Sequence, residues 1–129
     1  MSRSIQSKKT EHSKAMEEHL TPFQHVLMVS ISRNPDYAFS GYLHEYIQNE
    51  IGISAKEPQI RVTLQRLEKK GYLDLEQSVP SPLGNSRSVT MYKITDKGID
   101  VLEKTNLYYA VINEFLTPSS PENGDGIER

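Results

Sequence analysis

The sequence predicts a mostly helical α+β domain, in which three helices precede a two-stranded hairpin and one long helix follows it. Apolar residues recur at helical spacing in three successive segments between residues 22 and 70. Residues 72–94 then alternate between apolar and polar side chains around a loop rich in turn formers. Helical spacing returns from Asp96, which predicts the last helix.

Composition limits the chain to one modest domain. It has 129 residues, of which 36% are hydrophobic and 25% charged, with a net charge of −2. The absence of cysteine excludes disulfides, thiol catalysis and thiolate metal sites. No apolar run is long enough to span a membrane, and the N-terminus lacks a signal-type apolar core. We therefore expect a cytoplasmic protein with no membrane partner.

The first strong helix is predicted to begin at Thr21 as the N-cap and Pro22 at the first position. It is apolar around much of its circumference and ends at the turn formers of residues 34–36, so we expect it in the centre of the core. A second helix is expected over residues 40–50, closed by Gly52.

The two ends of the chain are polar. Residues 1–20 are expected to be flexible, and a short helix over residues 11–20 would need a partner surface because it has few large apolar side chains. Residues 117–129 are rich in Ser, Pro, Gly and Asp, which predicts a disordered acidic tail.

The third helix is predicted over Pro58–Lys70, with Pro58 in the first turn and Gly71 as its C-cap. Apolar residues at helical spacing form one stripe, and the opposite face and its flanks are polar and basic, without an acid. Two interpretations of this face stay open: a solvated surface, and a surface that reads a DNA groove.

The next two elements are predicted strands, Tyr72–Glu76 and Arg87–Ile94, joined by a long loop over residues 79–86. Thr95 can cap the last helix, over residues 96–116. Three helices followed by a hairpin is the order of the winged helix-turn-helix fold, in which the third helix enters the major groove and the hairpin lies beside it. We therefore assign residues 21–95 to a DNA-binding domain.

Charge along the chain favours DNA as the partner of the third helix. Residues 58–93 contain six basic and three acidic side chains, whereas residues 96–129 contain three basic and seven acidic ones. Because salt screens distant charges, the local excess matters more than the net charge. Arginine and lysine contact phosphates, and glutamine, threonine and arginine pair with base edges. The candidate DNA-binding residues are Gln59, Arg61, Val62, Thr63, Gln65, Arg66, Lys69, Lys70 and Arg87.

Lys69 and Lys70 have a second interpretation of equal weight, since cations also stabilise the C-terminal end of a helix.

The last helix carries a broad apolar surface, more than one small domain needs at its end. Such a surface normally marks an interface, and a symmetric homodimer is the favoured solution. The alternative is that the helix folds back on its own core together with the N-terminal segment. The candidate dimer-interface residues are Ile99, Leu102, Tyr108, Tyr109, Ile112, Phe115 and Leu116.

Enzyme motifs are missing from the sequence. The four histidines show no metal-ligand spacing, and His44-Glu45 is followed by Gln48 where a zinc-protease motif has histidine. We expect no catalytic residue, no metal and no cofactor. Tyr42 and Tyr46 can line a pocket for a small-molecule effector, although packing is the favoured interpretation.

Three segments resemble the PadR-like transcriptional regulators: Ser40-Gly41-Tyr42, Pro58 through Leu73, and Met91 through Gly98. The resemblance covers about residues 23–116. It implies a dimeric DNA-binding regulator, often a repressor that acts at an inverted repeat. The recognition helix would be Pro58–Lys70, the wing tip Ser78–Arg87, and the dimerisation helix Asp96–Leu116, a single helix as in the family's short form.

The sequence thus predicts a regulator of transcription that binds double-stranded DNA. The alternative is a winged-helix module that binds protein, for example a replication, plasmid or phage accessory factor. The low net charge and a wing that carries only Arg87 as a basic residue near its tip favour that alternative.

Overall fold

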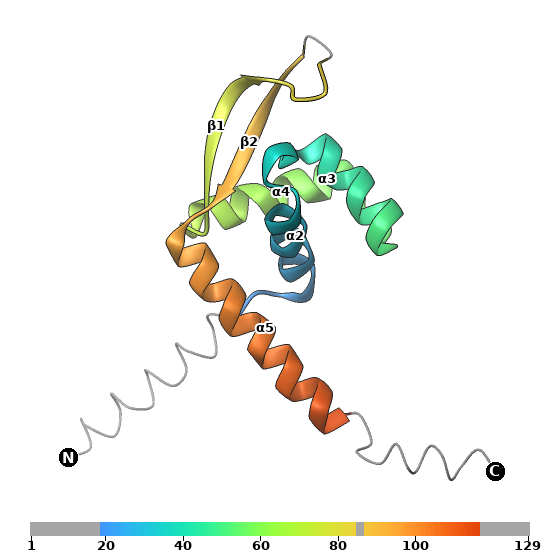
Figure 1. Ribbon diagram of the computed structural model, residues 1–129, viewed down its shortest axis with the longest axis vertical. Coiled ribbons are helices and arrows are strands. Elements are labelled where there is room, and N and C mark those ends of the chain that lie inside the picture. Colours follow the sequence, from blue (N-terminus) through green and yellow to red (C-terminus); the bar gives the residue numbers. More distant parts are fainter. Residues whose placement is uncertain (1–18, 85–86, 117–129) are drawn as a thin grey trace, which may run out of the picture. The chain divides into compact units, whose positions relative to one another are not determined.

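The computed structural model describes residues 19–84 and 87–116. They fall into two compact units, residues 20–102 and a second unit that holds residue 19 and residues 103–116. Residues 11–18 of the predicted N-terminal helix and the predicted acidic tail lie outside the described residues. The elements are α2 (Pro22–Arg33), the 3-10 turn η1 (Pro35–Tyr37), α3 (Ser40–Tyr46), the π-helical turn η2 (Ile47–Ile51), α4 (Glu57–Lys69), β1 (Leu73–Pro80), β2 (Ser88–Ile94) and α5 (Asp96–Leu116) (Figure 1).

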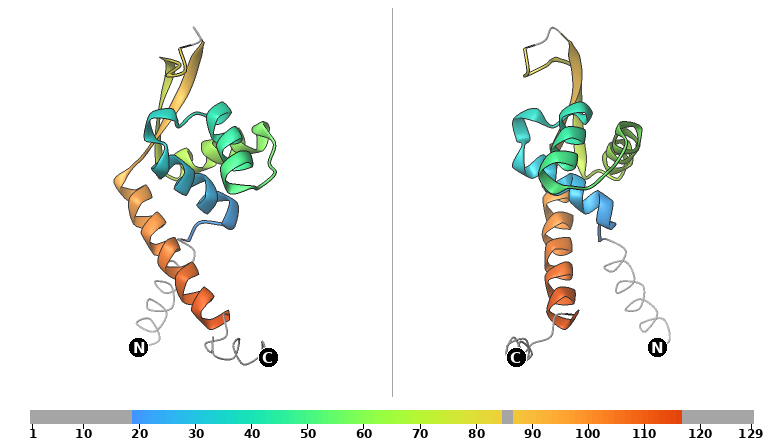
Figure 2. Two further views of the ribbon diagram at one scale, coloured as in Figure 1. Left: turned by 45° about the vertical axis from the view of Figure 1, so that its right-hand side comes forward. Right: turned by 90° about the vertical axis from the view of Figure 1, so that its right-hand side faces the viewer.

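The predicted fold class is confirmed. Three helices precede an antiparallel two-stranded hairpin, and a long helix follows it. In each view of the first unit, the hairpin extends away from α2, α3 and α4 (Figure 2). No helix within the described ranges is long and apolar enough to cross a membrane.

Helix α2 begins as predicted, with Thr21 as its N-cap. The Thr21 hydroxyl accepts from the Gln24 amide at 3.3 Å, and the Gln24 side-chain oxygen accepts from the Thr21 amide at 3.1 Å. This reciprocal capping box satisfies two backbone donors that the helix itself leaves unpaired. Leu27, Met28 and Ile31 are buried, which confirms the helix as the centre of the core.

The second predicted helix forms, but it widens before it ends. The regular α3 stops at Tyr46, and Ile47–Ile51 continue as a π-helical turn. Gly52 closes this turn in the left-handed conformation, with φ of 86°, and its amide donates to the Ile47 carbonyl at 2.9 Å. Glycine adopts this conformation without a Cβ clash, so its predicted role is confirmed.

Helix α4 begins at Glu57, one residue earlier than predicted, so that Pro58 is its second residue. It ends at Lys69, one residue before the predicted Lys70, and Gly71 follows in the conformation that the prediction requires. Gly71 has a φ of 83°, and the Tyr72 amide donates to the Leu67 carbonyl at 3.0 Å. Such a left-handed ending satisfies the last carbonyl groups of the helix.

The core of the first unit lies between α2, α3, α4 and the base of the hairpin. The apolar stripe of α4 (Ile60, Leu64 and Leu67) is completely buried. The cluster consists of Leu20, Leu27, Met28, Ile31, Ala38, Leu43, Ile47, Ile60, Leu64, Leu67, Tyr72, Leu73, Tyr92 and Val101. Burial of one face of α4 leaves the other face toward solvent.

The first strand is longer than the sequence predicts. It runs to Pro80, because pairing with β2 continues beyond a β-bulge between Glu76 and Val79. After the bulge, Val79 pairs with Val89. Ser78 adopts a φ of 57° within this bulge. The predicted end of the strand at Glu76 is therefore wrong, and the loop of the wing is shorter than expected.

The end of α4, the hairpin and the start of α5 meet at Thr95. Its hydroxyl donates to the Gly71 carbonyl at 2.6 Å and accepts from the Gly98 amide at 3.0 Å. This confirms Thr95 as the cap of the last helix. A Cβ atom on Gly98 would lie 2.2 Å from the Tyr72 carbonyl oxygen, so only glycine fits there.

Gly98→Ala should therefore lower the free energy of unfolding, by about 1–3 kcal/mol, because the added methyl group meets backbone that cannot yield. Urea unfolding followed by circular dichroism measures the loss. Gly41→Ala is the matched control, because a Cβ there would sit at an ordinary 3.7 Å from the Phe39 ring. Equal stability of the two variants would contradict the close approach at Gly98.

Candidate nucleic-acid interface

The outer face of α4 is the exposed side of this helix, opposite the buried stripe. A rotation of about 100° per residue places Pro58, Val62, Gln65 and Lys69 along its middle. Val62 is 45% exposed, an apolar side chain in a polar surface. The exposed predicted residues on this face are Gln59, Arg61, Val62, Gln65, Arg66, Lys69 and Lys70.

The charged side chains of this helix are mostly basic, although the net charge of the chain is negative. Residues 56–70 contain five basic and two acidic side chains. Helical geometry places both acids, Glu57 and Glu68, on one edge together with Arg61. Gln59, Arg66 and Lys70 occupy the opposite edge. The two edges of the outer face therefore differ in electrostatics.

The edge that carries Glu57, Glu68 and Arg61 borders a hollow of about 340 Å³, which lies between the start of α3, α4 and the hairpin. The structure brings Arg61 and Gln65 of α4 to Arg87 of the wing here. The lining residues are Phe39, Ser40, Gly41, Glu57, Arg61, Gln65, Ser81, Arg87, Ser88, Val89, Thr90 and Tyr92. Two guanidinium groups and several hydroxyl groups suit this hollow to a phosphate-bearing ligand.

The opposite edge borders a second hollow, of about 510 Å³, beside the N-terminus of α2. Gln59, Val62 and Arg66 lie together here, with Phe23 and the cap residue Thr21. Amide and guanidinium groups next to an apolar side chain offer donors, acceptors and a methyl contact, the three kinds of contact that base edges accept.

Thr63 does not share the exposure of its neighbours. It is 9% exposed, and its hydroxyl donates to the Gln59 carbonyl at 2.8 Å. A helical threonine commonly makes this bond to the carbonyl four residues earlier. Its hydroxyl proton is thus already used within the helix.

Glu57 is a site residue that the sequence analysis missed. Its Oε2 accepts from the Ser40 hydroxyl at 3.1 Å and lies 3.6 Å from Nη1 of Arg61. The predicted helix begins at Pro58 and leaves Glu57 outside it, so the i,i+4 spacing of Glu57 to Arg61 carried no weight. A predicted helix that began at Glu57 would have shown the pair from its spacing alone.

The wing contributes one predicted residue, Arg87. It is exposed, and its carbonyl accepts from the Ser81 amide at 2.9 Å, which closes the strands at the tip. At the tip, Leu83 is 54% exposed. Among the residues of the wing tip that the structure describes, Arg87 carries the one positive charge.

Tyr92 forms part of the floor of the first hollow. Its amide donates to the Ala38 carbonyl at 2.9 Å, so the strand is tied to the turn before α3. Burial raises the pKa of the Tyr92 hydroxyl above its usual value of 10.0, and the negative charge of Glu68 adds to the effect. The neutral phenol is therefore the stable form in the folded protein.

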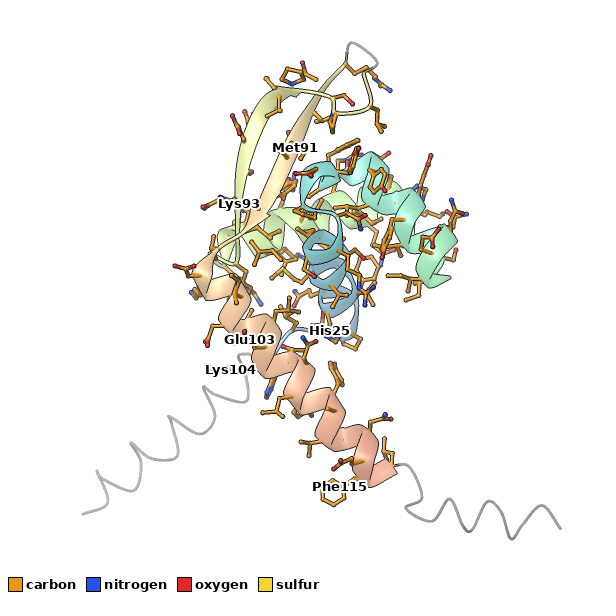
Figure 3. The ribbon with its side chains drawn as sticks, in the orientation of Figure 1. His25, Met91, Lys93, Glu103, Lys104 and Phe115 are labelled. Atoms are coloured by element: carbon orange, nitrogen blue, oxygen red, sulfur yellow. The ribbon has the colours of Figure 1, made fainter. Side chains whose placement is uncertain are left out.

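The predicted interface residues on α5 fall into both units. Ile99 and Leu102 belong to the first, where Leu102 packs against the core. Beyond them, Phe115 is 84% and Leu116 75% exposed, and Phe115 projects from the last turn of the helix (Figure 3).

The second unit has an exposed stripe that includes a residue the sequence analysis missed, Leu107. It is 66% exposed and lies in one arc with Tyr108, Val111 and Phe115. Its four-residue spacing to Val111 was the available signal. Tyr108 also stacks on His19, with ring centroids 4.3 Å apart.

Within the described ranges, no group of three or more His, Cys, Asp or Glu side chains could hold a metal ion. Tyr42 stacks on Tyr37 with ring centroids 4.9 Å apart, which is a packing role. The effector pocket at Tyr42 and Tyr46 stays a prediction.

The sequence matches no protein-family model and no curated protein. Solved structures do match, among them a PadR-family transcriptional regulator from Eggerthella lenta, with 20% identity, a TM-score of 0.57, and coverage of 87% of this chain and 93% of that one. The chain has the winged-helix fold of these regulators. The PadR-like resemblance is thereby confirmed at the level of the fold.

Two further structures share this fold. The PcaV transcriptional regulator from Streptomyces coelicolor, solved with its natural ligand, has 19% identity and a TM-score of 0.60, and the match covers 95% of this chain and 82% of PcaV. The S. aureus MepR–DNA complex has 14% identity and a TM-score of 0.56, with 97% and 88% covered. At these identities the likeness concerns the fold alone.

The raised pKa of Tyr92 predicts a loss of stability in alkali. Below pH 10.0 the phenol is neutral in both states; above it the unfolded chain loses this proton first, so unfolding becomes easier until the folded pKa is passed. Tyr92→Phe should lose less free energy of unfolding than the wild type between about pH 8 and about pH 11. Tyr42→Phe, at a partly buried position, is the control, and equal losses in all three proteins would contradict the assignment.

Proposed function

We propose that this chain is a transcriptional regulator that binds double-stranded DNA with the outer face of α4. The observation that carries the proposal is the composition of this face: exposed arginine, lysine and glutamine side chains on the third helix of a winged-helix fold. Solved proteins of the same fold include named transcriptional regulators and one complex with DNA, which supports the assignment.

In this proposal α4 lies in the major groove, with its contacts divided by chemistry. Gln59, Gln65 and Arg66 are suited to base edges, because amides pair with adenine and guanidinium groups with guanine. Lys69, Lys70 and Arg61 are suited to phosphates, which supply affinity that depends on salt. Val62 offers an apolar contact to a thymine methyl group.

The wing adds a contact at the edge of the site. Arg87 lines the same hollow as Arg61 and Gln65, so a phosphate beside the recognition helix can meet both guanidinium groups. The wing then positions the helix rather than reading bases, since its tip presents a single cation.

We further propose that the protein acts as a homodimer through α5 and binds an inverted repeat. The exposed apolar stripe of Leu107, Tyr108, Val111 and Phe115 supports this part, because burial against a second copy removes it from water. A two-fold axis then presents two copies of α4 to two half-sites.

Repression is the form of regulation that needs least from the protein, because occupation of a promoter can by itself exclude the transcription machinery. We therefore propose a repressor. A small-molecule effector is a further part of the proposal, supported by the PcaV structure, which contains that protein's natural ligand.

The second candidate function is a protein-binding winged-helix module. Pairing of Arg61 with Glu57 and the single cation of the wing tip favour it, because both reduce the attraction for a polyanion. A measurement of DNA binding at several salt concentrations distinguishes the two functions. The regulator should bind DNA with an affinity that depends on salt, and the protein-binding module should not.

Replacing Arg66 and Lys69 together with Ala should weaken binding to a duplex recovered by selection from a random DNA pool. Loss of the Arg66 base contact should cost about 1–3 kcal/mol, and loss of the Lys69 phosphate contact should lower the slope of log K against log salt by about 1. Fluorescence anisotropy at several salt concentrations measures both effects.

The matched control replaces Lys93 and Lys104 with Ala, which removes one positive charge from β2 and one from α5 (both residues are labelled in Figure 3). This variant should keep the specific affinity. If the α4 variant binds as the wild type does, the outer face of α4 is not the recognition surface.

The dimer is tested by charges placed in the apolar stripe of α5. Leu107→Asp with Phe115→Asp should halve the mass measured by light scattering, because an interface cannot bury unpaired carboxylates. Asn106→Asp with Asn113→Asp adds the same charge one or two positions away, at exposed polar residues. A dimer that persists in the first variant would exclude the stripe as the interface.

A further inference from the structure

Glu57 joins two parts of the candidate interface through a single oxygen atom. Its Oε2 accepts from the Ser40 hydroxyl at the start of α3 and lies 3.6 Å from the Arg61 guanidinium. Ser40 therefore restrains the carboxylate, which in turn restrains Arg61. All three residues line the hollow that faces the wing.

The pair is weak enough to exchange partners. The Arg61 side chain is 52% and the Glu57 side chain 40% exposed, and an exposed pair of this kind contributes little to stability. A DNA phosphate can bind two N–H groups of a guanidinium group at once, which is a stronger contact than the single 3.6 Å approach of Glu57. The pair can thus open when a DNA phosphate comes close to Arg61. Until then, Glu57 keeps Arg61 from binding other phosphates.

The depth at which the recognition helix lies in the DNA groove differs between specific and non-specific complexes. Non-specific binding relies on phosphates alone, whereas base contacts draw a recognition helix into the groove. In the deeper position a phosphate comes close enough to displace Glu57 from Arg61. In the shallow position, a phosphate is within reach only of an Arg61 side chain that Glu57 does not hold.

We propose that Glu57 is a positioning residue that determines specificity, by holding Arg61 away from phosphates except in the specific complex. This inference rests on the proposed DNA-binding function. Glu57 then suppresses binding to unrelated DNA more than binding to the operator, so its loss raises affinity and lowers discrimination. A purely structural role would change stability and would leave discrimination unaltered.

The test compares Glu57→Gln with the wild type on two duplexes: one recovered from a random pool and a scrambled version of the same composition. For the scrambled duplex, the slope of log K against log salt should steepen by about 0.9, which is one added phosphate contact. Affinity for the selected duplex should rise less, so the ratio of the two affinities falls several-fold. Ser40→Ala, which keeps both charges but releases the carboxylate, should give a smaller change in the same direction.

Two controls separate restraint of Arg61 from simple repulsion. Glu68→Gln removes a carboxylate from the same edge of α4, where no ion-pair partner occurs among the described residues, and should leave the slope unchanged. In an Arg61→Gln background, Glu57→Gln should have no further effect on the scrambled duplex. An effect of the same size in that background would overturn the inference.

The outcomes also distinguish this inference from the proposed function. A wild-type protein that binds neither duplex in a salt-sensitive manner would overturn both. A wild-type protein that binds the selected duplex, with an unchanged affinity ratio in Glu57→Gln, would overturn the role of Glu57 alone.

Discussion

The Thr95 hydroxyl connects three segments on which the rest of the structure depends. It donates to the Gly71 carbonyl at the end of α4 and accepts from the Gly98 amide in the first turn of α5. The Thr95 amide donates to the Tyr72 carbonyl at 3.1 Å, and Gly98 has no side chain where that carbonyl approaches. The base of the hairpin therefore lies directly beside the end of α4. This junction places the wing next to the surface that we assign to DNA.

The buried stripe of α4 determines the orientation of its outer face. Ile60, Leu64 and Leu67 are inaccessible to water, and burial of each such side chain contributes about 1.5–3 kcal/mol. Rotation of the helix would expose them, so the basic face points to solvent. The outer residues are consequently available for recognition, and Thr63 is the one predicted residue that packing removes from solvent.

Electrostatics on α4 are local rather than global. The chain has a net charge of −2, yet residues 56–70 carry an excess of three positive charges. Screening limits the field of distant acids at physiological salt, so DNA would meet the helix rather than the whole protein. The two edges of the face differ, because Arg61 is paired with Glu57 while Gln59 and Arg66 have no acid beside them on the helix. Under the role proposed for Glu57, this arrangement favours selective over general attraction to phosphates.

The order of elements, the polar face of α4 and the caps at Thr21, Gly52 and Gly71 could be predicted from the sequence alone. They follow from periodicity, N-cap chemistry and left-handed glycine, which depend on residues close together in the chain. The bulge before Val79 could not, because strand pairing depends on the partner strand. The Glu57 contact to Ser40 spans 17 residues and exists only because α3 packs against α4. Local chemistry thus determined which face of α4 is polar, and only tertiary packing decided which side chains on that face already have a partner.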